Sequence, residues 1–524
     1  MKGYLAIVLH SHLPYVRHPE FNDFLEEDWL YEAITETYIP LLDVFTRLVS
    51  DRVDFHITLS LTPTLLEMLS DDLLMKRYGR HLQKLIELSE KEIQRTHDDP
   101  AINPLSRMYD DRFKHYMDMF KNRYRGNIIT GFKEFMDAGM IEIVTSAATH
   151  AYLPLLIDEK WQDVQIHTGV DTYRNHLGTS PEGIWLPENA YTEGIDRILN
   201  RYGIKYTFLD AHGLLNASVR PVYGVYAPIC SEEGVNFFGR DMQSAKQVWS
   251  AKEGYPGDYD YREFYRDVGY DLGFEYVKPY LHSDGSRSNL GIKYYRITGQ
   301  TDQKQPYVPQ WARNKVQAHA GNFVFNREKH IEYLSGIMDR KPLIVAAYDA
   351  ELFGHWWFEG PEFIEHVFRK IHEINGSVKT ITPGMYLKEY PENQIAQPSQ
   401  SSWGDKGYHE VWLNGTNDWI YKHVHIAQDR MDELMHLSPV SRKQQRAIDQ
   451  ALRELLLAQS SDWPFIMNSG TMVEYAKKRF ISHIARFTYL YEQIKNNRID
   501  HRFLEGIESR DNIFPWIQYR NYAI

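Results

Sequence analysis

Two acidic residues directly follow short apolar segments. Glu188 follows residues 183–187 (GIWLP), and Asp349 follows residues 343–348 (LIVAAY). Such segments are typical of buried strands, so each carboxyl group is expected at the C-terminal end of a strand. Two carboxyl groups across one pocket suit the cleavage of a glycosidic bond, because one attacks or stabilises the anomeric carbon and the other protonates the leaving oxygen. A separation of about 5–5.5 Å would favour a retaining reaction and about 6.5–9.5 Å an inverting one.

The neighbours of both acids also fit a sugar substrate. Sugars present flat C–H faces that stack on aromatic rings, and the rings beside the two acids are Trp185, Tyr191, Tyr348, Trp356 and Trp357. A carbohydrate-binding protein without catalysis would use these rings but not the acids.

Histidines and further acids at other strand ends permit a different interpretation. They are His10, His12, His150, Asp210, His212 and Asp349. This set resembles the ligands of a metal-dependent amidohydrolase or deacetylase barrel, where imidazoles and a carboxylate bind zinc and activate water. That interpretation leaves Glu188 and the Trp-rich segments without a role.

Short apolar segments alternate with segments of helical periodicity up to about residue 390. The apolar segments are 4–9, 53–61, 141–145, 183–187, 206–209 and 343–348. The alternation predicts parallel β-α units, and polar residues at the strand ends predict a closed α/β barrel with its site at that face. An open doubly wound sheet is the alternative. Nucleotide binding is not indicated, because no G-x-G-x-x-G or G-K-[ST] loop follows a strand.

Two regions interrupt this alternation. Residues 79–135 are charged and helical in pattern, which predicts a helical insertion, and residues 390–400 are rich in Pro, Gln and Ser, as in a linker. Beyond the linker, helical patterns occur without strand signals at about 418–436, 440–460 and 470–496. We therefore predict a catalytic barrel over 1–389, insertion included, and a C-terminal all-helical domain over 401–524.

Composition excludes several classes of protein. The net charge of -12 argues against a nucleic-acid partner, since phosphate backbones are bound by a surplus of Lys and Arg. A single cysteine, Cys230, excludes an internal disulfide framework and a cysteine-rich zinc site. No stretch approaches the roughly 18 apolar residues of a membrane span, and the first residues lack a signal-peptide core. These features predict a cytoplasmic protein with no membrane partner.

Five motifs occur in order over nearly the whole chain. They are HSHLPY (10–15), THAYLPL (149–155), GIWLPENAY (183–191), YDAELFGHWWFEG (348–360) and WGDKGYHEVWL (403–413). Together they resemble glycoside hydrolase family 57, and most of all its 1,4-α-glucan branching enzymes and related α-amylases. The resemblance implies a (β/α)7 barrel, a helical domain that closes one side of the site, and a retaining mechanism without metal or other cofactor.

The resemblance also implies roles for individual residues. Glu188 falls on the nucleophile, Asp349 on the general acid/base, and His10 and His150 on the sugar subsite beside the cleaved bond. Other substrate contacts carried over from the family are Arg266, Trp403, Trp412 and Asp462. From the residues themselves, we add His12 as a donor to sugar hydroxyls and Trp357 as a ring that walls the site. Trp403 and Trp412 are predicted to stack on glucose rings; the alternative is that they anchor the helical domain.

The predicted substrate is an α-1,4-glucan such as amylose, glycogen or a starch-like polysaccharide. Glu188 would form a glycosyl-enzyme, which either the 6-hydroxyl of another chain or water would then attack. Some branching members of the family carry a tyrosine on a mobile loop over the site, and residues 229–248 contain none. Branching is the favoured prediction, with α-amylase-type hydrolysis as the alternative.

Overall fold

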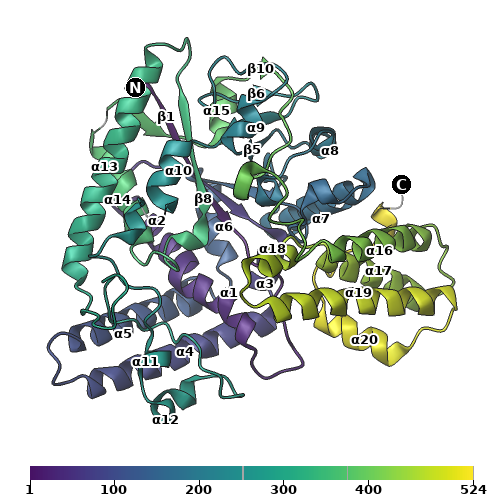
Figure 1. Cartoon of the computed structure of the whole chain (residues 1–524), viewed down its shortest axis with the longest axis horizontal. Coiled ribbons are helices and arrows are strands. Elements are labelled where there is room, and N and C mark those ends of the chain that lie inside the picture. Colours follow the sequence, from purple (N-terminus) through teal and green to yellow (C-terminus); the bar gives the residue numbers. More distant parts are fainter. Residues whose placement is uncertain (251–252, 375, 523–524) are drawn as a thin grey trace.

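The fold is built on parallel strands that follow one another around a barrel. The computed structural model (Figure 1) describes residues 1–250, 253–374 and 376–522. In this described part of the chain, seven strands form a parallel ladder in the order β7-β5-β4-β3-β2-β1-β8. Their bounds are β1 Gly3–Ser11, β2 Ile57–Leu61, β3 Ile141–Ser146, β4 Gly183–Trp185, β5 Tyr206–Leu209, β7 Asn236–Gly239 and β8 Leu343–Asp349. The first strand pairs with both the second and the last, which is the order of a barrel and not of a doubly wound sheet.

The two ends of the ladder approach each other. The backbone N–H of Asp241, just after β7, donates to the carbonyl of Val345 in β8 at 2.9 Å. Short strands extend this arrangement: β6 (Ile229–Cys230) is antiparallel to β7, β10 (Gln394–Ile395) pairs with β6, and β9 (Val378–Thr380) pairs with β1. The predicted (β/α)7 barrel is confirmed.

The apolar runs are continuous because both faces of each strand are buried. Along β1, the side chains of Tyr4, Ala6 and Val8 join a cluster inside the barrel, while those of Leu5, Ile7 and Leu9 pack toward the surrounding helices. Successive side chains of a strand point to opposite faces. The inner set of β1 therefore continues to His10, and the inner set of β8 (Leu343, Val345 and Ala347) continues to Asp349. Strand alternation alone directs both polar side chains into the barrel mouth.

Helices cover the outside of the barrel. Among them are α2 (Ile39–Ser50), α7 (Glu159–Leu177), α13 (Pro309–Ser335) and α14 (Gly360–Ile374). Helix α14 buries an apolar stripe at spacings of three and four residues: Phe363, Ile364, Val367, Phe368 and Ile371. This stripe packs α14 against its neighbours α13 and α2.

Two further groups of helices lie outside this ring. Helices α4 (Asp72–Arg95), α5 (Asn103–Asp118) and α6 (Ile129–Asp137) occupy the predicted insertion, and α4 begins seven residues before its predicted start at residue 79. After the barrel come α16 (Trp419–Met435), α17 (Arg442–Ala458), α18 (Asp462–Ser469), α19 (Val473–Lys495) and α20 (His501–Arg510). Figure 1 shows these yellow-green helices beside the barrel, with α18 closest to the strands. The domain limits 1–389 and 401–524 stay predictions.

Membrane insertion of a helix is not supported. Across the described residues, every helix is too short or too polar to cross a bilayer.

Candidate active site

Glu188 lies in a strained turn at the end of β4. The 3-10 turn Pro187–Asn189 follows the strand directly, and Glu188 and Asn189 adopt φ values of 61° and 49°. Left-handed backbone in such residues costs of the order of 1 kcal/mol or more and persists only where surrounding contacts enforce it. One such contact is the backbone N–H of Trp403, which donates to the Glu188 carbonyl at 3.0 Å.

Each oxygen of the Glu188 carboxylate accepts one hydrogen bond. The indole Nε1–H of Trp403 donates to Oε2 at 2.9 Å, and the Ser461 hydroxyl donates to Oε1 at 3.0 Å. Burial raises the pKa of Glu188 to about 7, and these two donors act in the opposite direction. Both donors bind the charged form of the carboxyl group, so they hold the pKa of Glu188 below the value that burial alone would give.

A chain of hydrogen bonds reaches Ser461 from β1. His10 Nδ1 lies 3.0 Å from the Ser60 hydroxyl, His10 Nε2 lies 3.0 Å from His150 Nε2, and His150 Nδ1 lies 2.9 Å from the Ser461 oxygen. Burial holds the pKa values of both histidines well below their usual range, so both rings are neutral.

Because both imidazole rings are neutral, the hydrogen bonds of this network can run in only one donor-to-acceptor direction. The Ser461 hydroxyl donates its hydrogen to Glu188, so its oxygen can only accept from His150, and His150 Nδ1–H must be the donor. His150 Nε2 then accepts from His10 Nε2–H, and His10 Nδ1 accepts from Ser60. The chain fixes the tautomers and orients the Ser461 donor toward Glu188.

Asp349 lies beside this network, on the strand next to His10, and has different support. It is the last residue of β8 and pairs with His10 in the β1–β8 ladder. Burial and the neighbouring charge of Glu351 raise the pKa of Asp349 to about 7, against the lowering effect of Arg240. Among the described residues we find no hydrogen bond to its carboxyl group. A buried carboxyl group without donors favours its protonated form, as a general acid requires.

His12 and Asp462 also reach the site. His12 Nε2 lies 3.0 Å from Asp462 Oδ2, and the His12 ring stacks on His150 with ring centres 3.7 Å apart. Burial lowers the pKa of His12, but the charge and hydrogen bond of Asp462 outweigh it and the net shift is upward. The site thus contains a His–Asp pair in which the pKa of His12 is raised, beside two histidines whose pKa values are lowered.

The geometry does not support the metal-ligand interpretation. The facing nitrogens of His10 and His150 bind each other, and His12 binds Asp462. Asp210 caps α9 (Ala211–Leu215), and His212 donates to the Gly407 carbonyl. In the described ranges, three metal-capable donors come within 4.8 Å of one another only at Glu454, His483 and Asp511, in the C-terminal helices.

Two of the tryptophans predicted to contact substrate, Trp357 and Trp412, are buried. Trp357 is 1% exposed and packs on Phe353 and Phe363, because Gly354 (φ 119°) turns the chain and the Gly354 N–H donates to the Trp357 carbonyl. A side chain at Gly354 would collide with the Glu36 carbonyl, so the turn requires glycine. The exposed ring is Trp356, which stacks on Phe264 at 4.4 Å.

Trp412 is also an internal residue. It is 1% exposed and stacks on Tyr152 with ring centres 4.5 Å apart, above Gly404. This position fits the anchoring alternative and not the stacking of glucose.

Arg266 lies away from the carboxylate pair. Its guanidinium binds Asp271 at 2.8 Å and lies over Tyr295, and within the described residues it has no contact with the site. The arginine whose charge acts on Asp349 is Arg240, whose Nε donates to the Ala347 carbonyl.

Sequence reasoning missed Ser461, Ser60 and Arg240. Ser461 directly precedes Asp462, which the family resemblance already singled out, so its position gave a usable signal. Ser60 lies near the end of β2 and Arg240 directly follows β7, but Ser and Arg at strand ends are too common to single out.

Comparison with known proteins places this chain in a family. The model described as glycosyl hydrolase family 57 matches residues 6–330. The chain belongs to glycosyl hydrolase family 57. A second model, the C-terminal region of 1,4-alpha-glucan branching enzymes, matches residues 423–522.

The similar proteins include both branching enzymes and an alpha-amylase. A 1,4-alpha-glucan branching enzyme of Thermococcus kodakarensis is 35% identical, covering 98% of this chain and 78% of its own. The structure of the alpha-amylase AmyC of Thermotoga maritima is 45% identical with a TM-score of 0.94, covering 100% and 99% of the two chains. The structure of a branching enzyme of this family from Pyrococcus horikoshii is 32% identical with a TM-score of 0.89, covering 100% and 97%.

Proposed function

We propose that this protein is a retaining 1,4-α-glucan branching enzyme acting on amylose, glycogen or a similar polysaccharide. The observation that carries the proposal is the asymmetry of the two strand-end carboxyl groups. Glu188 has a neutral donor on each oxygen, whereas Asp349 is buried beside Glu351. One group is thus prepared to be a nucleophile and the other a proton donor.

The reaction follows from these two states. The Glu188 carboxylate attacks the anomeric carbon while Asp349 gives its proton to the departing glucosyl oxygen, which leaves as a free 4-hydroxyl. Asp349, now a carboxylate, takes the proton of an incoming 6-hydroxyl as that oxygen attacks the glycosyl-enzyme and releases Glu188. The products are a shortened donor chain and an α-1,6 branch.

The Trp403 and Ser461 donors act throughout this cycle. They stabilise the Glu188 charge before attack and again when the carboxylate is released, and they fix the orientation of the attacking oxygen. Both come from the region after residue 400, so the segment that includes the C-terminal helices completes the site.

Transfer to a sugar and transfer to water are both supported by specific observations. The match to the branching-enzyme C-terminal model and the branching enzymes at 32–35% identity favour transfer to a 6-hydroxyl. The alpha-amylase at 45% identity and the absence of tyrosine from residues 229–248 favour hydrolysis as the second candidate. A cytoplasmic location, inferred from composition, belongs to the same proposal.

Trp356 is the ring we assign to substrate stacking, in place of Trp357. It is 53% exposed, its face packs on Phe264, and it follows Asp349 by seven residues. A rigid stacked pair at this position offers a platform for a glucose ring. By analogy with base–aromatic stacking, such a contact contributes about 1–3 kcal/mol.

The test is incubation with amylose, followed by counts of new reducing ends and of α-1,6 linkages. Branching predicts α-1,6 linkages well in excess of reducing ends, whereas hydrolysis predicts reducing ends alone. Trp356→Ala should raise KM for amylose about ten-fold or more. Trp311→Ala, which removes an equally exposed tryptophan from helix α13, should leave KM unchanged. An unchanged KM in Trp356→Ala contradicts the platform.

A further inference from the structure

One turn of the long helix that begins with α1 (Asp28–Ala33) and continues into α2 is π-helical. In the turn Ile34–Tyr38 the hydrogen bonds span one residue more than in an α-helix, and the Ile39 N–H donates to the Ile34 carbonyl. Single π-helical turns inside α-helices are rare and frequently lie at functional sites. This turn packs against residues 349–356, a segment that begins with the proposed acid and ends with the proposed stacking ring.

Three contacts join the π-helical turn to the segment that follows β8. The Tyr38 hydroxyl donates to Glu351 Oε1 at 2.5 Å, and His355 Nδ1 lies 2.6 Å from Glu36 Oε2. The Glu36 carbonyl lies directly against Gly354, where a side chain would collide with its oxygen. The turn therefore fixes both the backbone and two side chains of this segment.

Glu36 is the charged partner of His355. Burial alone would raise the pKa of Glu36, but the hydrogen bond and charge of His355, with the charges of Lys293 and Arg262, outweigh it and the net shift is downward. A charged carboxylate only accepts hydrogen bonds, so His355 Nδ1–H is the donor. Glu32 lies one turn earlier and 3.9 Å from the same nitrogen, and burial raises its pKa. Glu36 is thus the acid that holds the His355 ring.

The His355 ring in turn supports the aromatic pair proposed for substrate stacking. It stands nearly perpendicular to both Trp356 and Phe264, with ring centres 5.3 Å apart in each case. Lys293 Nζ lies 4.1 Å from the centre of the Phe264 ring, and its charge interacts with that of Glu36. Glu36 therefore acts on one ring by way of His355 and on the other by way of Lys293.

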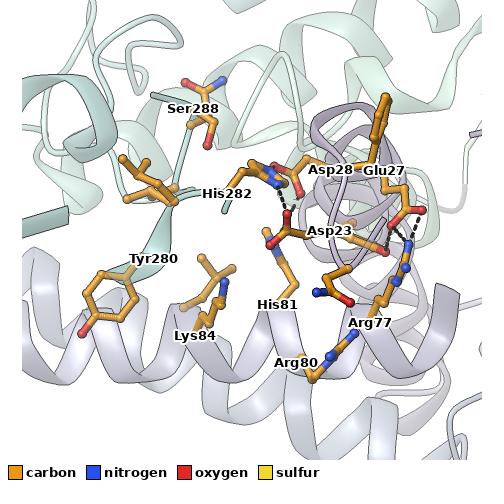
Figure 2. Close-up of a pocket in the computed structure, with 17 residues that line it drawn as sticks. Asp23, Glu27, Asp28, Arg77, Arg80, His81, Lys84, Tyr280, His282 and Ser288 are labelled. Carbon is orange, nitrogen blue, oxygen red and sulfur yellow. Dashed lines mark hydrogen bonds and ion pairs between the residues drawn. The ribbon is translucent and has the colours of Figure 1, made fainter. Parts of the chain in front are cut away.

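The start of the same helix is fixed by two ion pairs (Figure 2). Arg77 Nη1, on α4, donates to both oxygens of Glu27 at 2.6 and 2.7 Å, and His282 Nε2 lies 2.5 Å from Asp28 Oδ2. A binding side chain is held precisely when its supporting residues are themselves fixed on regular elements. The π-helical turn meets this condition because its helix is anchored on the insertion.

We propose that Glu36 is a positioning residue for substrate binding, which acts through His355 on the orientation of Trp356. The inference rests on the proposed role of Trp356 as a platform for a glucose ring. A ring that is already held in its binding orientation loses less conformational entropy when the substrate stacks on it. Loss of the Glu36 contact should therefore weaken the binding of a glucan and leave the chemistry of the two carboxyl groups in place.

Calorimetric titration with maltoheptaose in the Glu188→Gln background tests the proposal without turnover. Glu36→Leu should raise the Kd by about three-fold to ten-fold, and His355→Phe, which keeps a ring but loses the donor, should do the same. Glu36→Gln keeps an acceptor for His355 and should bind almost as well as the parent. Glu32→Gln is the matched control and should leave the Kd unchanged, because burial already favours the neutral form of Glu32.

A double-mutant cycle separates positioning from a general loss of structure. In a Trp356→Ala background, Glu36→Leu should raise the Kd no further, because the ring through which it acts is gone. Circular dichroism checks each fold, and His355→Phe decides the question if Glu36→Leu does not fold.

Several results would overturn the proposal. They are additive losses in the cycle, an unchanged Kd in His355→Phe, and an equal loss in Glu32→Gln. An unchanged Kd in Trp356→Ala would overturn it together with the platform. If the Kd differences persist but the wild-type chain forms no α-1,6 linkages, only the branching function is refuted, so the two failures are distinguishable.

Discussion

Two buried networks of acids and histidine in this chain are built in opposite ways. In the C-terminal helices, His483 Nδ1 lies 2.7 Å from Glu454, Arg486 binds Asp511 at 2.5 Å, and Arg479 binds His483 Nε2 at 3.2 Å. The network thus contains two arginines and two carboxylates. At the barrel mouth, the donors to Glu188 are a neutral indole and a neutral hydroxyl. Arg240 and His12 act on Asp349 through their charges, without a hydrogen bond to its carboxyl group among the described residues.

The difference separates a structural network from a reactive one. Removing ions from water costs several kcal/mol per ion, and burial raises carboxyl pKa values in both networks, that of Asp511 in the helices to about 6 despite its arginine partner. At the mouth, where the donors to Glu188 are neutral, burial raises the pKa of Glu188 and of Asp349 to about 7. Groups that exchange protons near neutral pH are what acid/base catalysis requires.

The largest expected effect comes from removing the reactive carboxyl groups. Glu188→Gln and Asp349→Asn should each lower kcat by about 10³-fold or more, because each residue acts in both chemical steps. Steady-state kinetics on amylose measure the loss, and circular dichroism checks the fold. Glu182→Gln changes an exposed acid close to β4 and is the control.

Azide provides an independent check of the nucleophile. In Glu188→Ala a small anion can occupy the vacated position, so azide should restore turnover of a small activated substrate. Near-normal activity in Glu188→Gln or Asp349→Asn would contradict the assignment of the barrel-mouth network as the reactive one.

The helical network should respond in stability and not in catalysis. Arg486→Met leaves Glu454 and Asp511 with Arg479 alone, and breaking a buried ion pair costs about 3–5 kcal/mol. Urea denaturation should show this loss in the free energy of unfolding, while kcat of the folded enzyme stays the same. Lys477→Met, in an exposed pair on the same helix, should change stability by less than about 0.5 kcal/mol. A fall in kcat without destabilisation would contradict the structural role.

Trp403→Phe tests the donor on Glu188. The indole N–H stabilises the charged carboxylate, so its removal should raise the pKa of Glu188 and shift the acidic limb of kcat/KM upward by about one pH unit. Reducing ends and α-1,6 linkages should fall together, because the nucleophile serves both. Trp412→Phe is the matched control, since the Trp412 Nε1 has no hydrogen-bond partner among described residues. A selective loss of branches would instead favour the stacking role predicted from the sequence.

Glu351→Gln should give the smallest effect. The negative charge of Glu351 raises the pKa of Asp349, so its removal lowers that pKa. Catalysis needs protonated Asp349, and the basic limb of kcat/KM should therefore move to lower pH, by less than about one unit. Glu373→Gln, an exposed acid on α14, should leave the limb in place. A shift to higher pH would refute the assignment of Asp349 as the acid.

Much of the fold was predictable because strand alternation and helical periodicity are patterns within short segments of sequence. Residues 343–348 had to be buried on both faces, and residue alternation then directed Asp349 into the barrel. The helical insertion was predictable from periodicity, although α4 begins at Asp72, before its predicted start. Placement at strand ends also predicted that His10, His150 and Glu188 would meet.

Packing decides which of the predicted aromatic side chains are exposed. Trp356 and Trp357 are adjacent and chemically identical, so composition cannot tell which ring is buried. The turn at Gly354 and the fit of Trp357 against Phe353 and Phe363 make that choice. Trp412 is buried for the same kind of reason, by its contact with Tyr152.

The sequence by itself determined which residues could do chemistry and that strands would present them, because side-chain type and strand period are properties of short segments. Only the tertiary structure decided the chemical state of each group. The donors to Glu188 lie 215 and 273 residues away in the chain, at Trp403 and Ser461. Hydrogen bonding and burial across such separations set the different surroundings of the two carboxyl groups, and no local pattern encodes them.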